Sequence, residues 1–328
     1  MSQNEMGESG PSLSLETTVA AGTLVPHELL EKARGYAADA KAPRTRREYK
    51  RAWDAFMAWC EGQGRTPLPA LPDTVALYLT ARAETRKVST IEQDLVAISA
   101  AHQAAGLETP RSAAVVREVR SGIRRRLGAA PKVKAPLLAE DLKKVVSVLP
   151  ATLVGIRDRA LLLLGFAAAL RRSELVGLEV RDLEWTEEGL KLRLRRSKTD
   201  QEGLGRPIGV PHGKEACPVQ ALKAWLEAAG ITEGPVFREV TRHGRVGESA
   251  LSGRSVARVV QRAALGAGLE AGSYAGHSLR AGLATSAARG GKSERAIMNQ
   301  TGHKSSTMVR RYIRDAELFR ENAAEGLL

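Results

Sequence analysis

The sequence predicts a mainly α-helical protein with one small antiparallel β-hairpin. Along most of the chain after the first two dozen residues, apolar side chains recur at intervals of three and four, the period of an amphipathic helix. Residues 190–194 instead alternate leucine with lysine and arginine, the period of a half-buried strand. The chain has 328 residues and is 43% hydrophobic, enough to build two domains with a core in each.

The first part of the chain is expected to be a tail followed by a helical domain. Residues 1–24 are rich in Ser, Gly, Glu and Thr without an apolar period, which predicts a disordered tail. Residues 25–127 show helical periodicity throughout and predict a compact helical domain. One helix is expected to begin at Leu29, and a second carries an apolar stripe from Tyr49 to Cys60. A third begins at Pro72, a fourth is capped by Ser89, and a fifth spans about 111–126.

Residues 128–136 have the composition of a linker. They contain two prolines and no periodic apolar residues, which favours an extended, solvated segment. Lys132 and Lys134 suit a strap that lies along a phosphate backbone, and an ordinary charged linker explains them equally well.

Residues 137–328 are expected to form a second, helix-rich domain. The strand at 190–194 is predicted to pair with a partner at 207–210, and the polar stretch 197–203 forms the turn between them. The expected helices are 139–149, 155–169, 173–178, 215–229, 252–267, 275–289, 293–300, 305–314 and 316–324.

Composition limits the class of partner. The net charge is +13 and the sequence pI is about 10.0, which indicates a polyanion, nucleic acid before membrane, unless the protein is merely basic. Cys60 and Cys217 are far apart and outside any CxxC pattern, which argues against a disulfide framework or a zinc site. The N-terminus has no signal-peptide pattern, and the longest apolar stretch, 160–170, is too short to span a bilayer, so we expect a cytoplasmic protein.

One tyrosine lies in a notably cationic sequence near the C-terminus. Tyr312 stands in Val-Arg-Arg-Tyr-Ile-Arg, and His303 precedes it in Thr-Gly-His-Lys. Upstream are His277 and Arg280 in His-Ser-Leu-Arg, and Arg171 in Ala-Leu-Arg-Arg-Ser-Glu-Leu. A phenol is a weak nucleophile because its pKa is about 10. Fixed cations that stabilise both the phenolate and a phosphate make such a group suitable for forming a phosphotyrosine without a metal.

Each of these residues has an ordinary structural explanation when it is taken alone. Arg171 could be a surface arginine at a helix end, with Arg172 as the competing candidate. His303 could be a capping or packing residue, and Tyr312 a half-buried aromatic on its helix. The functional hypothesis depends on the four motifs occurring together and in this order.

Together, the four motifs resemble those of the tyrosine recombinase (phage integrase) family. The intervals also match, with 26 residues from His277 to His303 and 9 more to Tyr312. The motifs cover residues 137–328, and the helical first domain resembles the simple, two-domain, Cre-like members. Cre itself has tryptophan where this chain has His303. The resemblance implies the tyrosine recombinase catalytic fold in the second domain and a core-type DNA-binding domain in the first.

The resemblance also implies roles for three residues that would contact the phosphate. Tyr312 would attack the scissile phosphate and become a 3′-phosphotyrosine, while Arg171 and Arg280 would bind its non-bridging oxygens. This agrees with the chemistry of phosphoryl transfer, whose transition state spreads negative charge over the equatorial oxygens. Arginine stays charged and presents donors as a fork that matches those oxygens.

The remaining implied roles concern protons and support. His303 would donate a further hydrogen bond to the phosphate, and His277 would exchange a proton with the nucleophile. Lys198, on the turn between the two strands, would protonate the departing 5′-oxygen, with Lys191 as a nearby competitor. Glu174 would support the arginines. The sequence has no acidic cluster typical of a magnesium site and no phosphate-binding glycine loop, so no metal and no cofactor is expected.

The implied partner is double-stranded DNA with an inverted-repeat target site. Four protomers on two sites would exchange strands through a Holliday junction, in a bacterial, phage- or plasmid-encoded setting at the nucleoid. An apolar helix at about 316–328 would dock into a neighbouring subunit, or pack within its own. Each basic residue alone could be a solvated surface charge. The candidate DNA contacts are Arg44, Arg46, Arg47, Lys50, Arg86, Lys87, Arg117, Arg120, Arg124, Arg125, Lys132, Lys134, Arg254 and Arg258.

Two other functions remain open from the sequence. A topoisomerase IB-like enzyme would use the same chemistry to relax supercoils without sequence preference. A catalytically idle DNA-binding regulator would occupy an operator and leave no protein-linked DNA. The complete set of candidate catalytic residues argues against the regulator.

Overall fold

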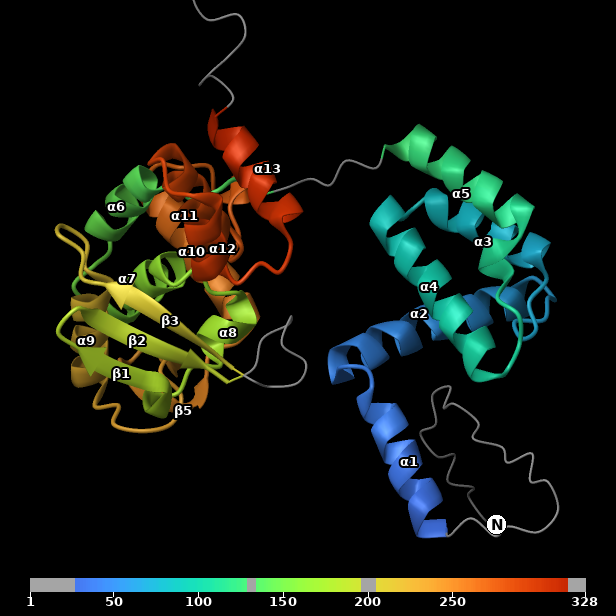
Figure 1. The fold of residues 1–328 in the computed structure, drawn as a ribbon, viewed down its shortest axis with the longest axis horizontal. Coiled ribbons are helices and arrows are strands. Elements are labelled where there is room, and N and C mark those ends of the chain that lie inside the picture. Colours follow the sequence, from blue (N-terminus) through green and yellow to red (C-terminus); the bar gives the residue numbers. More distant parts are fainter. Residues whose placement is uncertain (1–26, 129–133, 196–204, 318–328) are drawn as a thin grey trace, which may run out of the picture. The chain divides into compact units, whose positions relative to one another are not determined.

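The computed structural model describes residues 27–128, 134–195 and 205–317 (Figure 1). The chain divides into two compact units, Met1–Pro131 and Lys132–Leu328, which are described separately. Both units are built mainly from helices, and antiparallel strands occur in the second, so the predicted fold class is confirmed.

The first unit packs its helices around an aromatic core. Trp53 and Phe56 form a tilted ring pair on one helix, and each makes an edge-on contact with another helix, Trp53 with His102 and Phe56 with Tyr78. Cys60 is buried in the same cluster, so three residues of the predicted apolar stripe face the core, whereas Met57, which was expected in the stripe, is 38% exposed. Proline opens two of the helices, where its missing N–H costs no hydrogen bond. The helices are α1 (His27–Asp39), α2 (Pro43–Gly62), α3 (Pro72–Ala83), α4 (Val88–Ala104) and α5 (Ala114–Leu127), with a 3₁₀ turn at Pro110–Ser112.

The start of α4 differs from the sequence prediction, because Ser89 is not its N-cap. Lys87 takes that place with an extended backbone, φ −73° and ψ 151°. Its carbonyl already accepts hydrogen bonds from the backbone of Thr90 and Ile91, at 2.9 and 3.1 Å. The helix therefore begins before the serine, which lies in the first turn.

The second unit surrounds a buried central helix, α7. Leu161, Leu162 and Leu164 on this helix are fully buried, and α7 packs against α9 and α11. Among residues 27–128, 134–195 and 205–317, no helix is both long and apolar enough to cross a membrane. The helices of the unit are α6 (Ala139–Ser147), α7 (Leu153–Ala167), α8 (Arg172–Val176), α9 (Pro218–Ala229), α10 (Gly253–Gly266), α11 (Ser278–Arg289), α12 (Glu294–Thr301) and α13 (Ser306–Glu317).

An antiparallel sheet covers one side of this unit, in the order β1-β2-β3 (Figure 1). The predicted hairpin corresponds to β2 (Gly189–Leu194) and β3 (Arg206–Pro211), and Leu192 is opposite Ile208 in its register. The sequence prediction missed β1 (Leu183–Thr186), whose residues are mostly exposed and show no alternation. It also missed the short pair β4 (Arg238–Val240) and β5 (Val246–Ala250).

Two predicted boundaries of the second unit change in the structure. The helix expected to end at 314 continues as α13 through Glu317, so the predicted break before 316 is wrong. The end of the predicted linker is joined to the second unit, because the backbone N–H of Ala135 donates to the Ser273 carbonyl at 2.8 Å. The predicted tail 1–24 and residues 318–328 lie outside the described residues.

Candidate active site

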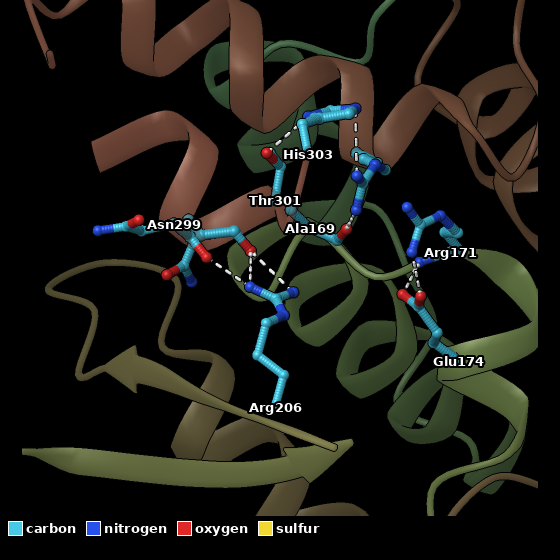
Figure 2. A network of polar contacts seen from close by, with 9 residues as sticks. Ala169, Arg171, Glu174, Arg206, Asn299, Thr301 and His303 are labelled. Atoms are coloured by element: carbon cyan, nitrogen blue, oxygen red, sulfur yellow. Dashed lines mark hydrogen bonds and ion pairs between the residues drawn. The ribbon is translucent and has the colours of Figure 1, made fainter. Parts of the chain in front are cut away.

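The first arginine of the site is fixed by the turn that follows α7. Ala169 in this turn has φ +49°, in the left-handed region, and directs the chain into α8. Arg171 precedes α8, and its backbone N–H donates to Oε2 of Glu174 at 2.8 Å while its Nη1 donates to Oε1 at 2.5 Å (Figure 2). The Glu174 side chain is only 2% exposed, so this carboxylate restricts where the Arg171 guanidinium can lie.

The second arginine lies almost entirely inside the protein. Arg280, on the first turn of α11, is 1% exposed, and its Nη1 donates to the Ala169 carbonyl at 2.8 Å. Its Nη2 donates to Nε2 of His303 at 3.2 Å. Burial, followed by the charge of Arg171, lowers the pKa of Arg280 to about 10. The group therefore stays charged at neutral pH in surroundings that favour an added anion.

His303 is presented by the break after α12. The helix ends at Thr301, and Gly302 turns the chain with φ +66°, which glycine adopts without strain. Nδ1 of the His303 ring lies 2.7 Å from the Thr301 hydroxyl oxygen. Burial and then the charges of Arg280 and Arg171 lower the pKa of His303 to about 4, so the imidazole is neutral at pH 7.

Sequence reasoning missed a third arginine, Arg206 at the start of β3. Its guanidinium donates to the carbonyls of Asn299 and Gln300 at the end of α12 (Figure 2). It lies directly against Gly302, where a Cβ atom would approach the Arg206 Cζ to 2.8 Å. The φ angle favours glycine here, and a larger residue would also displace the Arg206 guanidinium. The available signal was an arginine beside the polar turn that also carries Lys198.

Tyr312 lies on α13, which packs against α11. The Tyr312 ring lies with Ile313 beside a small apolar cluster that includes Val309. Its hydroxyl is 3.5 Å from Nε2 of His277, a long contact at the edge of hydrogen-bonding range. Burial, followed by the charges of Arg280, Arg171 and Arg172, lowers the pKa of His277.

The structure therefore brings the predicted site residues of the described chain to one place. The Arg280–His303 and His277–Tyr312 pairs are joined by a ring contact between His303 and Tyr312, with centroids 6.2 Å apart. The Arg171–Glu174 pair lies close enough for both charges to act on Arg280. Lys198 lies outside the described residues. A cluster of guanidinium groups with one carboxylate and neutral imidazoles is suited to bind an anion next to a phenol. In the described ranges, no three His, Cys, Asp or Glu residues gather as a metal site.

The candidate DNA contacts lie mostly on exposed parts of the two units. Arg120 and Arg124 pair with Glu92 at 2.7 and 3.3 Å, and Lys50 pairs with Asp54 at 3.0 Å. Lys132 lies outside the described residues. The exposed members are Arg44, Arg46, Arg47 and Lys50 on α2, Arg86 and Lys87 before α4, Arg117, Arg124 and Arg125 on α5, Lys134 before α6, and Arg254 and Arg258 on α10.

The sequence of the second unit matches the family described as the phage integrase family over residues 136–318. The chain belongs to the phage integrase family. This confirms the resemblance drawn from the four motifs.

Individual relatives extend the phage integrase assignment over both units. The chain is 41% identical over 298 residues to the integrase/recombinase xerD homolog of Selenomonas ruminantium, covering 89% of this chain and 87% of that protein. It is 29% identical over 285 residues to recombinase cre of Escherichia phage P1, with 80% and 81% covered. The solved structure of XerH site-specific recombinase bound to a palindromic difH substrate has a similar fold, with TM-score 0.64, 16% identity, and 88% and 81% covered.

Proposed function

We propose that this protein is a site-specific recombinase that cleaves and rejoins double-stranded DNA through a 3′-phosphotyrosine at Tyr312. The observation that carries the proposal is the placement of the Tyr312 hydroxyl 3.5 Å from His277, which itself lies beside Arg171 and Arg280. The names of the xerD-type relative and of recombinase cre support the same activity.

The covalent step follows from the chemistry of these groups. The Tyr312 oxygen bonds to phosphorus while the bond from phosphorus to the 5′-oxygen breaks. The phenol proton passes to His277, which can accept it because its lowered pKa keeps the ring neutral. In this proposal Lys198 gives a proton to the departing oxygen. Rejoining reverses these transfers, so the energy of the phosphodiester is kept in the phosphotyrosine.

The arginines and His303 act on the phosphate oxygens rather than on protons. Arg171 and Arg280 are fixed before DNA arrives, by Glu174 and by the Ala169 carbonyl respectively. Such preorganised donors stabilise the charge that develops in the transition state, and losing one typically costs roughly 3–4 kcal/mol. His303 completes this group of donors.

The assembly that we propose follows the domain division. The first unit, as a core-type DNA-binding domain, and the second unit bind an inverted-repeat site, and four protomers on two sites exchange strands through a Holliday junction. An apolar cavity of about 440 Å³ on the second unit, lined by residues of α6, α7, α11 and α12, suits an apolar segment such as residues 316–328 of a neighbouring protomer. We place this reaction at the nucleoid in the cytoplasm.

The experiment is covalent capture on candidate target DNA. Duplexes from the region flanking the gene are incubated with the protein, denatured, and resolved in a gel that separates protein-linked DNA. We expect an adduct from the wild type, and none from Tyr312→Phe although that variant still shifts the same DNA in a native gel. An adduct from Tyr312→Phe contradicts the proposal.

Covalent capture separates a DNA-binding regulator from a recombinase, and relaxation of supercoiled plasmids separates a topoisomerase. A topoisomerase IB-like enzyme would relax supercoiled plasmids whatever their sequence, whereas a recombinase requires a defined pair of sites. A DNA-binding regulator would shift DNA and form no adduct.

A further inference from the structure

A buried hydroxyl lies behind the proposed phosphate-binding histidine. Thr301, the last residue of α12, is completely buried. Its Oγ1 lies 2.7 Å from Nδ1 of His303 (Figure 2). The same oxygen lies 2.7 Å from the Ile297 carbonyl. The hydroxyl therefore bridges a backbone acceptor and a ring nitrogen whose protonation state decides what His303 can do.

The contacts on the ring determine which nitrogen carries the proton in the protein without DNA. A carbonyl oxygen only accepts, so the single hydroxyl proton of Thr301 points to Ile297. The Thr301 oxygen then accepts from His303, which requires a proton on Nδ1. On the other side of the ring, the Arg280 guanidinium can only donate, so Nε2 must accept. Both neighbours thus favour the Nδ1–H form of a neutral ring.

This form cannot perform the role assigned to His303 above. A bare Nε2 does not donate a hydrogen bond to a phosphate oxygen. When a phosphate accepts the hydrogen bonds of Arg280, Nε2 of His303 can bind the phosphate only if it carries a proton. Nδ1 of the neutral ring is then an acceptor and requires a donor. Rotation of the Thr301 hydroxyl supplies that donor without moving any heavy atom. The ring loses a proton from Nδ1 to solvent and gains one from solvent on Nε2, so its charge is unchanged.

We propose that Thr301 is a positioning residue that sets the tautomer of His303, accepting from Nδ1–H in the DNA-free protein and donating to Nδ1 when Nε2–H binds phosphate. The inference rests on the proposed function, because it assigns His303 a phosphate oxygen. Valine matches threonine in shape but has no hydroxyl, so it removes both halves of the exchange, whereas serine keeps them.

The first measurement reads the tautomer directly. The full chain, labelled with ¹⁵N in its 6 histidines, gives long-range ¹H–¹⁵N correlations that distinguish Nδ1–H from Nε2–H, and His303→Gln assigns the signal. We expect Nδ1–H in the wild type. We expect the ratio of Nδ1–H to Nε2–H to fall about fivefold in Thr301→Val, the effect of one hydrogen bond. An unchanged ratio in Thr301→Val overturns the inference.

The second measurement is the rate of adduct formation on the duplex found by covalent capture. We expect Thr301→Val to form the adduct about tenfold more slowly, with the DNA concentration for half-maximal rate within twofold of wild type, and Thr301→Ser to restore the rate to within threefold. Thr74→Val, which removes an equally buried hydroxyl in the first unit, should leave the rate unchanged. A wild-type rate in Thr301→Val, or a serine variant as slow as the valine variant, overturns the inference.

The two measurements separate this inference from the function on which it rests. If His303→Gln forms the adduct at the wild-type rate, the role of His303 is wrong while the tautomer result still reports on Thr301. If no DNA forms an adduct with the wild type, the proposed function fails, and the tautomer ratio alone decides whether Thr301 controls the ring.

Discussion

Replacing Glu174 by glutamine tests whether one buried carboxylate holds in place Arg171, the arginine that we propose to bind the phosphate. Glu174 accepts both from the backbone N–H of Arg171, at 2.8 Å, and from its guanidinium, at 2.5 Å. Glutamine keeps an oxygen for the backbone N–H and loses the charge. The Arg171 guanidinium is then left near Arg280 and Arg206 without its anionic partner.

The structure sets the size of the expected loss. Removing one partner of a buried ion pair costs about 3–5 kcal/mol. Here the Arg171 side chain is 19% exposed and can recover some hydration, so we expect Glu174→Gln to lower the free energy of unfolding of the second unit by about 2–3 kcal/mol. Glu174→Ala also loses the acceptor at the start of α8 and should cost about 1 kcal/mol more.

The DNA complex should respond differently from the free protein. A bound phosphate supplies the missing anion, so Glu174→Gln should bind DNA at least as tightly as the wild type. Its adduct formation should be about tenfold slower, because Arg171 is no longer oriented.

Urea titration of the full chain measures the free energy of unfolding, and hydrogen exchange in peptides of the second unit locates the change. The rate of adduct formation and the affinity for DNA are measured on the same variants. Glu184→Gln is the matched control. Its exposed pair with Lys191, with Glu184 62% exposed, should be worth at most about 1 kcal/mol. A Glu174→Gln variant that is as stable and as fast as the wild type refutes the reasoning.

Two further predictions concern His303 and its supporting turn. The pKa of His303 is lowered to about 4 in the folded protein, whereas an unperturbed histidine has a pKa of about 6.5. Between these two pH values the unfolded chain binds a proton that the folded chain does not bind. The free energy of unfolding should therefore decrease as pH falls from about 6.5 toward about 4, by at most about 1.4 kcal/mol per pH unit. Urea titrations at several pH values check this, and His303→Gln should flatten the dependence; an equally steep curve in that variant would assign the effect to other groups. Arg206→Lys loses the fork that binds the Asn299 and Gln300 carbonyls, so adduct formation should slow about tenfold while DNA affinity stays within twofold. An unchanged rate in Arg206→Lys would mean that this anchor does not matter for His303.

The sequence was most informative where periodicity and motif coincide. The long helices and the β2–β3 hairpin follow from apolar period alone, since Leu190 and Leu192 alternate with charged residues and are buried. The site residues were recognisable because each lies in a short motif, although only the fold shows that α8, α11, α12 and α13 bring them together.

The features that the sequence did not predict depend mostly on contacts between residues far apart in the chain. β1 depends on pairing with β2 rather than on its own pattern, since its residues are largely exposed. Arg206 contacts backbone carbonyls and Thr301 contacts a ring nitrogen, and such contacts leave no periodic signal in the sequence. Ser89 shows the opposite error, in which a favourable cap residue is overridden because the helix starts earlier.

The measurement that bears most directly on the central claim is the chemical identity of the protein–DNA bond. An adduct trapped on target DNA is digested with nuclease and trypsin, and the modified peptide is sequenced by mass spectrometry. We predict a nucleotide joined through its 3′-phosphate to Tyr312, in the tryptic peptide Tyr-Ile-Arg. A bond to any other residue, or a linkage through a 5′-phosphate, would contradict the account.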